Sequence, residues 1–238
     1  GVAYSPVRNA YGLMHQRSPD NWIELNFVES DGSLELSAPI AVGFACPRTQ
    51  MVWLSGTFFI PSFNACGPWY AVSEAGGVTA TGLSHPYPQN VVVGGGRLNV
   101  LAGSGVFKLD PADVAISVAV TLQGQHTAAA VTRIGWDGTM IVWAARDAAG
   151  VTYERFFPNG FIETTWPVTT KLLDPVDTAT APAANSDPAR VGVLLNEGTS
   201  NLYLFVRNQD GSEALPLGLV AGGNDVVDAH LFWDGTQF

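Results

Sequence analysis

A strand-turn-strand unit that occurs twice constrains the fold of this chain more than any other feature. Residues 131–146 hold an apolar strand that ends in Trp136, the turn Asp137-Gly138, and a second apolar strand. Its core, Trp-Asp-Gly-Thr, returns at residues 233–236. Asp-Gly favours a tight hairpin because glycine accepts the positive φ that such a turn requires. The recurrence predicts a chain built by repeating β-hairpins.

Strand patterns dominate the rest of the sequence, and helical periodicity over about 11 residues or more is hard to find. Short runs rich in Val, Ile, Phe, Trp and Tyr alternate with turn-forming Gly, Pro, Asn and Asp. The clearest stretch, residues 131–166, predicts four consecutive strands joined by short turns. Residues 174–190 are polar and rich in Pro, Ala and Asp, so they predict the longest loop. Residues 229–238 predict a strand, a turn and the start of another strand.

A longer unit of strand, polar turn, aromatic strand, Asp/Gly turn and strand recurs along the chain. It occurs at residues 11–36, 51–80, 131–157 and 190–217, with a weaker version at 97–128. Repeats of about 40–50 residues, each forming a four-stranded meander, are typical of β-propeller blades. The sequence therefore predicts one all-β domain, residues 1–238, folded as a β-propeller of about five diverged blades. The N-terminal strand would complete the unit that begins at the C-terminus. A β-sandwich or jelly roll, which needs strands but no repeat, is the alternative.

One stretch also resembles a known kind of protein. The run from Trp136 to Trp143, followed by a glycine turn and residues 153–160, is similar to repeat units of secreted bacterial and phage β-propellers. In those repeats a Trp-Asp/Asn-Gly-Thr turn leads into an apolar strand that ends in Trp. The similarity covers residues 131–160 well and residues 190–217 and 228–238 in part. The size also resembles five-bladed lectins, whose repeats are more nearly identical. The resemblance implies an architecture and no particular activity.

Charge and hydropathy exclude several classes of partner. The formal net charge is -10, and the chain has two lysines, Lys108 and Lys171. This balance argues against nucleic acid, whose phosphates require clusters of Lys and Arg, and against docking on anionic membranes. We find no apolar run of about 18 residues, so membrane insertion is not expected. With 47% hydrophobic and 13% charged residues, the chain can form a large core and apolar subunit interfaces in a homo-oligomer.

Motifs for catalysis or cofactor binding are weak, and no cofactor or metal is expected. The four histidines are scattered, and the sequence has no phosphate-binding loop and no nucleophile elbow. A propeller glycosidase would need two or three converging carboxylates. The acids that could supply them are Glu24, Asp113, Glu154, Asp187 and Asp228. Most acids of this chain lie in turns, where Asp bonds locally, so the sequence favours binding over catalysis. Cys46 and Cys66 can form a disulfide or remain two thiols, and the sequence leaves both open.

Tryptophans in polar surroundings are the candidate ligand-binding residues. Exposed indole rings can stack on the C–H faces of sugars, and neighbouring carboxylates can accept hydrogen bonds from hydroxyls. The candidates are Trp22, Glu24 and Asn26 on one strand face, Trp69 after a constrained loop, and the turn residues Trp136, Asp137, Trp233 and Asp234. The turn residues also have a structural explanation, because Asp-Gly shapes a hairpin and Trp packs between sheets.

These patterns predict a non-catalytic recognition or assembly module on an extracellular or virion surface, with a glycan or a partner protein as its ligand. The supporting features are low charge, many aromatic residues and a repeat scaffold that presents loops. One alternative is a structural component of a bacteriophage tail or capsid that binds no glycan. The other is a propeller-type glycoside hydrolase.

Overall fold

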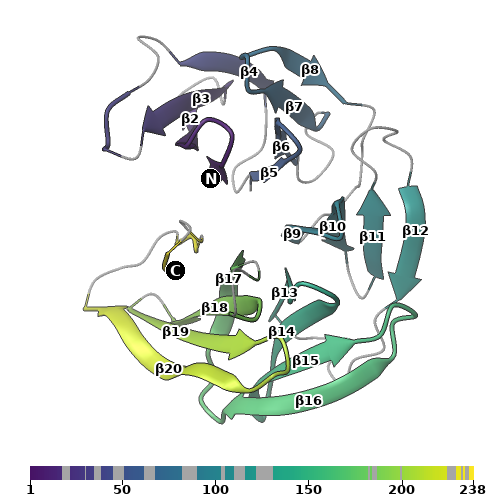
Figure 1. Cartoon of the computed structure of the whole chain (residues 1–238). Helices are drawn as coiled ribbons and strands as arrows, with labels where there is room; N and C mark the ends of the chain where they lie inside the picture. The colour runs from purple at the N-terminus through teal and green to yellow at the C-terminus, as the bar shows by residue number, and fades with distance from the viewer. Residues whose placement is uncertain are drawn as a thin grey trace. The chain divides into compact units, whose positions relative to one another are not determined.

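The computed structural model is all-β (Figure 1). It describes residues 1–17, 22–29, 31–34, 39–44, 51–61, 68–81, 90–102, 105–109, 116–121, 131–181, 183, 187–198, 200–223, 229–231, 233 and 236–238. None of these residues is helical, so the described chain has no helix that could span a membrane.

The chain forms two compact units. The first contains residues 1–103 and 107–118, and the second contains residues 104–106 and 119–238. The first eight strands all lie in the first unit. They are β1 Val2–Ser5, β2 Ala10–Arg17, β3 Trp22–Glu29, β4 Ile40–Phe44, β5 Val52–Leu54, β6 Thr57–Ile60, β7 Tyr70–Ser73 and β8 Val78–Ala80. The next four, which lie mostly in the first unit, are β9 Asn90–Gly94, β10 Arg97–Ala102, β11 Gly105–Leu109 and β12 Ile116–Thr121.

The second unit holds the two longest meanders. Its strands are β13 Val131–Trp136, β14 Ile141–Asp147, β15 Gly150–Phe156, β16 Ile162–Thr169, β17 Asp174–Ala181, β18 Arg190–Glu197, β19 Asn201–Asn208 and β20 Glu213–Gly222. The twenty strands form five four-stranded sheets, and each sheet uses four strands that are consecutive in the sequence. The prediction of about five four-stranded meanders is therefore confirmed, and the four strands predicted within residues 131–166 all form.

Short turns form where the sequence predicted them. Gly138 has a φ of 99° in the turn between β13 and β14. Gly95 and Gly96 have φ values of 60° and 72° between β9 and β10. Two consecutive residues with positive φ match the twist of a two-residue hairpin, and glycine adopts this conformation without steric cost. Gly95 and Gly96 therefore form a hairpin turn between the two short strands β9 and β10.

The region predicted as the longest loop contains a strand instead. β17 occupies Asp174–Ala181 and pairs with β18, so the loop prediction for residues 174–190 is wrong over its first half. The polar threonines of β17 are used for contacts between sheets. The Thr178 hydroxyl donates to the Ile134 carbonyl at 2.5 Å, and the Thr180 hydroxyl donates to the Trp136 carbonyl at 2.7 Å. A strand with few large apolar residues is thus held by hydrogen bonds to β13.

Replacing Thr178 by valine tests this role of the threonines. Valine keeps the shape of threonine but cannot donate to the Ile134 carbonyl, which lies in a buried part of β13. We expect a loss of about 1–2 kcal/mol in the free energy of unfolding, measured by urea denaturation. Thr79→Val is the matched control, because Thr79 is exposed on β8 and should tolerate the change. Equal effects of the two changes would contradict the hydrogen-bonding role.

The described residues of the C-terminal segment, 229–231, 233 and 236–238, do not form the strands predicted there, and β1 pairs with β2 within the first sheet. The expectation that the N-terminal strand completes a C-terminal unit concerns segments of two different units and stays a prediction. The described residues of the C-terminal segment pack on β18, where a Cβ added to Gly192 would meet Phe238 and Leu231. The Leu231 amide also donates to the Asp177 carboxylate at 3.0 Å.

The core follows the alternation of the strands. Along β3, Ile23, Leu25 and Phe27 are buried and pack with residues of the second sheet, including Phe58 and Ile60. In the second unit, the inner faces of β14 and β15 pack against β18 and β19 in one buried cluster. Each cluster lies between two consecutive sheets of its unit. On the opposite face of β3, Trp22 is exposed, and Glu24 and Asn26 are half-buried.

Candidate functional site

The outward face of the β2–β3 hairpin brings together polar and aromatic side chains. Trp22, Glu24 and Asn26 alternate along β3 on one face. In the antiparallel register, these three pair with Arg17, His15 and Leu13 of β2, respectively. Directly opposed residues share a face of the sheet, with Cβ atoms about 5 Å apart. We call these six residues the Trp22 face.

Glu24 is the centre of a hydrogen-bonded network on this face. One carboxylate oxygen lies 3.0 Å from His15 Nε2, and the other accepts from an Arg17 nitrogen at 3.1 Å. Asn26 Nδ2 lies 3.4 Å from His15 Nδ1. The Glu24 side chain is largely covered, whereas those of His15 and Arg17 are about half exposed. The network therefore holds the carboxylate in a fixed orientation beneath two more exposed cationic or hydrogen-bonding groups.

Trp22 supplies a flat apolar surface beside this network. The residue is 37% exposed, and it pairs with Arg17 across the hairpin. An indole ring next to a carboxylate and an amide can stack on one side of a ligand while the polar groups bind its hydroxyls. Glu24 is the one acid among the six residues of this face. The arrangement suits binding, since glycoside hydrolysis by the usual route needs two carboxylates.

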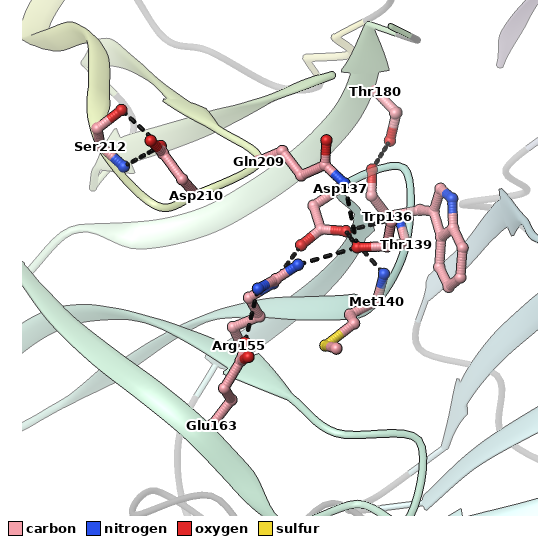
Figure 2. Close-up of polar contacts among 10 residues, drawn as sticks. All are labelled: Trp136, Asp137, Thr139, Met140, Arg155, Glu163, Thr180, Gln209, Asp210 and Ser212. Carbon is pink, nitrogen blue, oxygen red and sulfur yellow. Dashed lines mark hydrogen bonds and ion pairs between the residues drawn. The ribbon is translucent and has the colours of Figure 1, made fainter. Parts of the chain in front are cut away.

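The Trp136-Asp137 turn of the second unit lies in a different environment. Asp137 is 1% exposed, and one of its oxygens accepts from the Thr139 amide, the Thr139 hydroxyl and the Met140 amide at 2.7–3.0 Å. Its other oxygen pairs with Arg155 Nε at 2.5 Å. Figure 2 shows Arg155 reaching between Asp137 and Glu163. The candidate ligand residue Asp137 is thus engaged inside the protein, where it shapes the turn.

Arg155 was not a candidate from the sequence, yet it organises this region. Burial lowers the pKa of the guanidinium, but hydrogen bonds and charge from Asp137 and Glu163 outweigh burial and raise the pKa above its usual value. A second guanidinium nitrogen donates to the Thr139 hydroxyl at 2.9 Å. The Gln209 amide reaches the same hydroxyl at 3.3 Å from the turn after β19. This network therefore links the last two sheets of the second unit.

The remaining candidates that the structure describes are buried or half-buried. Trp69 is 1% exposed and packs in a core cluster with Phe59 and Leu98, so its ring is not presented to solvent. Trp136 is half-buried, and its carbonyl accepts from Thr180. Trp233 is half-buried with its ring 5.0 Å from that of Phe238. Asp234 lies outside the described residues, as do Cys46 and Cys66.

The acids considered for hydrolysis lie on different elements of the chain where they are described. Glu154 is fully buried on β15, next to the Thr165 hydroxyl at 3.5 Å. Asp187 is exposed before β18, 3.7 Å from Arg190. Asp113 and Asp228 lie outside the described residues. Within the described part of the chain, no group of three His, Cys, Asp or Glu side chains is arranged to hold a metal ion.

Comparison with known proteins supports the architecture. No protein-family model and no curated protein sequence matches the chain. One of two prolyl endopeptidases studied for inter-domain dynamics is similar to it in structure, with a TM-score of 0.57 and 12% identity over 94% of this chain and 36% of that chain. The Dos1 propeller has a TM-score of 0.52 and 8% identity over 97% of this chain and 62% of that one.

A third similar structure is prolyl oligopeptidase B from Galerina marginata, with a TM-score of 0.53 and 7% identity over 96% of this chain and 34% of that chain. This chain therefore spans about a third of the two peptidase chains and less than two thirds of the Dos1 propeller chain. At these identities the similarity concerns the fold alone. Together with the five consecutive four-stranded sheets, it shows that the chain is a β-propeller of about five blades.

Proposed function

We propose that this chain is a non-catalytic recognition module that binds a glycan on an extracellular or virion surface, and that the Trp22 face is its binding site. The observation that carries the proposal is the exposed indole of Trp22 beside a carboxylate that His15 and Arg17 hold in place. Three of the residues that the sequence nominated lie on this face.

The chemistry of the face matches a sugar ring. The apolar C–H side of a pyranose can stack on Trp22, while its hydroxyls donate to Glu24 and exchange hydrogen bonds with Asn26. Because Glu24 is already oriented by its neighbours, little side-chain entropy is lost when a ligand binds. A preformed site of this kind favours recognition over induced rearrangement.

Trp22→Ala tests the proposal most directly. We expect the wild-type chain to select particular glycans on an array, and the variant to bind the best of them at least about tenfold more weakly, equivalent to about 1.4 kcal/mol. The reason is that the stacking surface is removed while the sheet remains intact, since Trp22 points away from the core. Titration calorimetry with the selected glycan measures the affinity, and a thermal melt verifies folding.

Phe161→Ala is the matched control. Phe161 is also an exposed aromatic residue, but it lies in the turn before β16 and outside the Trp22 face. Its removal should leave the affinity unchanged. Selective binding that survives Trp22→Ala would place the site elsewhere, and a wild-type chain that selects no glycan would refute glycan recognition.

A further inference from the structure

His15 lies between two side chains of the Trp22 face that have opposite hydrogen-bonding requirements. Its Nε2 atom lies 3.0 Å from a Glu24 carboxylate oxygen, and its Nδ1 atom lies 3.4 Å from Asn26 Nδ2. A carboxylate accepts hydrogen bonds and does not donate, so His15 Nε2 carries a hydrogen and donates it. An amide nitrogen donates and does not accept, so His15 Nδ1 is the acceptor. These two contacts together define a neutral imidazole with its hydrogen on Nε2.

This protonation state fixes the orientation of the Asn26 amide. Because Nδ2 is turned toward His15, the amide oxygen Oδ1 lies on the other side, and it accepts no hydrogen bond within the described part of the chain. Asn26 is half-buried, and Leu13 lies directly opposite it on β2 and is 36% exposed. The Trp22 face therefore presents a hydrogen-bond acceptor next to an apolar side chain.

An acetamido group has the complementary chemistry. Its N–H donates and does not accept, which suits Asn26 Oδ1, and its methyl group suits the apolar surface of Leu13. A sugar hydroxyl is less selective, because it both donates and accepts. The acetamido group carries no charge, so the net charge of -10 does not oppose its approach as it would oppose an anionic sugar. This end of the face therefore fits an uncharged acetamido sugar.

The spacing along β3 requires more than one sugar ring. A strand rises about 3.3 Å per residue, so the Cα atoms of Trp22 and Asn26 are about 13 Å apart. A single ring stacked on Trp22 does not reach Asn26 over that distance. Glu24 lies between them, and each of its oxygens has one contact and a second lone pair for a hydroxyl donor. The ligand that fits spans at least two sugars, with an acetamido sugar at Asn26.

We propose that the Trp22 face binds an oligosaccharide whose acetamido N–H donates to Asn26 Oδ1, and that protonation of His15 switches this contact off. The proposal rests on the glycan-binding function proposed above, and adds the ligand class and the regulation of the same site. A second hydrogen on the imidazole places an N–H donor at Nδ1, opposite the donors of Asn26. The amide then turns over so that Oδ1 accepts from His15, and its nitrogen takes the place of the oxygen on the ligand side. Two donors then face each other where the acetamido group bound.

His15 is the group that carries the pH dependence. Between about pH 5 and 8, histidine is the side chain that ordinarily changes its charge. The charged groups that face it are Glu24 and Arg17, which binds the other Glu24 oxygen. The other titratable groups on the four strands of this sheet, and at the terminus that precedes them, do not contact His15 or Asn26; they are Tyr4, Tyr11, Glu29 and the α-amino group of Gly1. The affinity is therefore full above the titration of His15 and falls as the pH falls through it.

Nitrogen NMR on the ligand-free chain tests the switch without any sugar. At about pH 7.5 we expect the ring nitrogens of His15 to show a hydrogen on Nε2 alone. The side-chain amide signals of Asn26 should follow the titration of His15 down to about pH 5, because the amide turns over. A hydrogen on Nδ1 at the higher pH, or Asn26 signals that do not follow His15, would overturn the switch.

Matched oligosaccharide pairs test the ligand class. The members of each pair differ only in acetamido or hydroxyl groups, as diacetylchitobiose and cellobiose do. By titration calorimetry at about pH 7.5, we expect the acetamido member to bind about tenfold more tightly than the hydroxyl member, and to lose about tenfold in affinity at about pH 5.

Three variants assign these effects to their residues. Asn26→Ala should remove the acetamido preference, and His15→Ala should remove the pH dependence. His230→Ala is the matched control, because His230 also pairs with a carboxylate, that of Asp177 in the second unit, and its loss should leave both properties unchanged. Thermal melts verify that the variants fold.

The possible failures are distinguishable. Glycan binding without an acetamido preference would overturn the ligand class and leave the Trp22 face a glycan site. A pH dependence that survives His15→Ala would overturn the switch. If no oligosaccharide of either kind binds, the glycan-binding function fails and the acetamido ligand with it, while the NMR titration still decides whether His15 turns the Asn26 amide.

Discussion

Gly211→Ala is expected to lower the free energy of unfolding by about 2–5 kcal/mol. Gly211 has a φ of 82° in the turn between β19 and β20, a conformation that alanine adopts at a cost. A Cβ at this position would also overlap the ring of Trp166 on β16. Trp166 packs against Tyr153, with ring centroids 5.8 Å apart, so the ring cannot move without disturbing the buried cluster of the second unit.

Gly198→Ala separates the conformational cost of a positive φ from the steric overlap with Trp166. Gly198 lies in the preceding turn of the same sheet with a φ of 60°, and a Cβ there would meet no other atom within 4 Å. This control should lose only the conformational cost of about 1 kcal/mol. Urea denaturation followed by fluorescence measures both variants. If Gly198→Ala were as destabilising as Gly211→Ala, the packing of Trp166 on the glycine would not be the cause.

Hairpins are the part of this fold that the sequence predicts best. Asp137-Gly138 and the glycine run at 94–96 require particular backbone angles, and that requirement is local. The sequence did not predict β17, because this strand is stabilised by contacts with residues that are distant in the sequence. In the sequence, Thr178 and Thr180 are typical of a polar loop. In the structure, their hydroxyls donate hydrogen bonds to carbonyls of a neighbouring strand. That neighbour, β13, lies more than 40 residues earlier in the sequence.

The candidate site also has parts that local sequence patterns predict and parts that depend on distant contacts. Alternation along β3 places Trp22, Glu24 and Asn26 on one face, and this requires only the strand period. His15 and Arg17 follow from the hairpin register, because a four-residue connection between Arg17 and Trp22 fixes which residues face each other. Burial of a particular tryptophan is harder to predict. Whether Trp69 packs in a core or lies at the surface depends on which strands surround it.

Asp137→Ala is expected to destabilise the protein by about 3–5 kcal/mol. The change removes the acceptor for the Thr139 and Met140 amides, which shape the turn after β13. It also leaves the largely buried guanidinium of Arg155 with Glu163 as its one remaining carboxylate partner among the described residues. An incompletely paired charge in a low-dielectric environment is costly, and the loss of turn hydrogen bonds adds to that cost.

Two further variants separate the contribution of the negative charge of Asp137 from that of its hydrogen bonds to the turn. Asp137→Asn retains an oxygen for the turn amides but loses the negative charge, so it should cost less than Asp137→Ala. Asp210→Ala removes a similar turn acceptor, which bonds the Ser212 amide at 2.9 Å and the Ser212 hydroxyl at 2.6 Å, from an exposed position. We expect Asp210→Ala to lower the free energy of unfolding by less than about 1 kcal/mol in urea denaturation.

If Asp137→Ala were no more destabilising than Asp210→Ala, the ion pair with Arg155 would contribute little to stability, and the Trp-Asp-Gly-Thr turn would depend on local geometry alone. The predicted order, Asp137→Ala, then Asp137→Asn, then Asp210→Ala, follows because only Asp137 serves both the turn and a charge on a neighbouring strand.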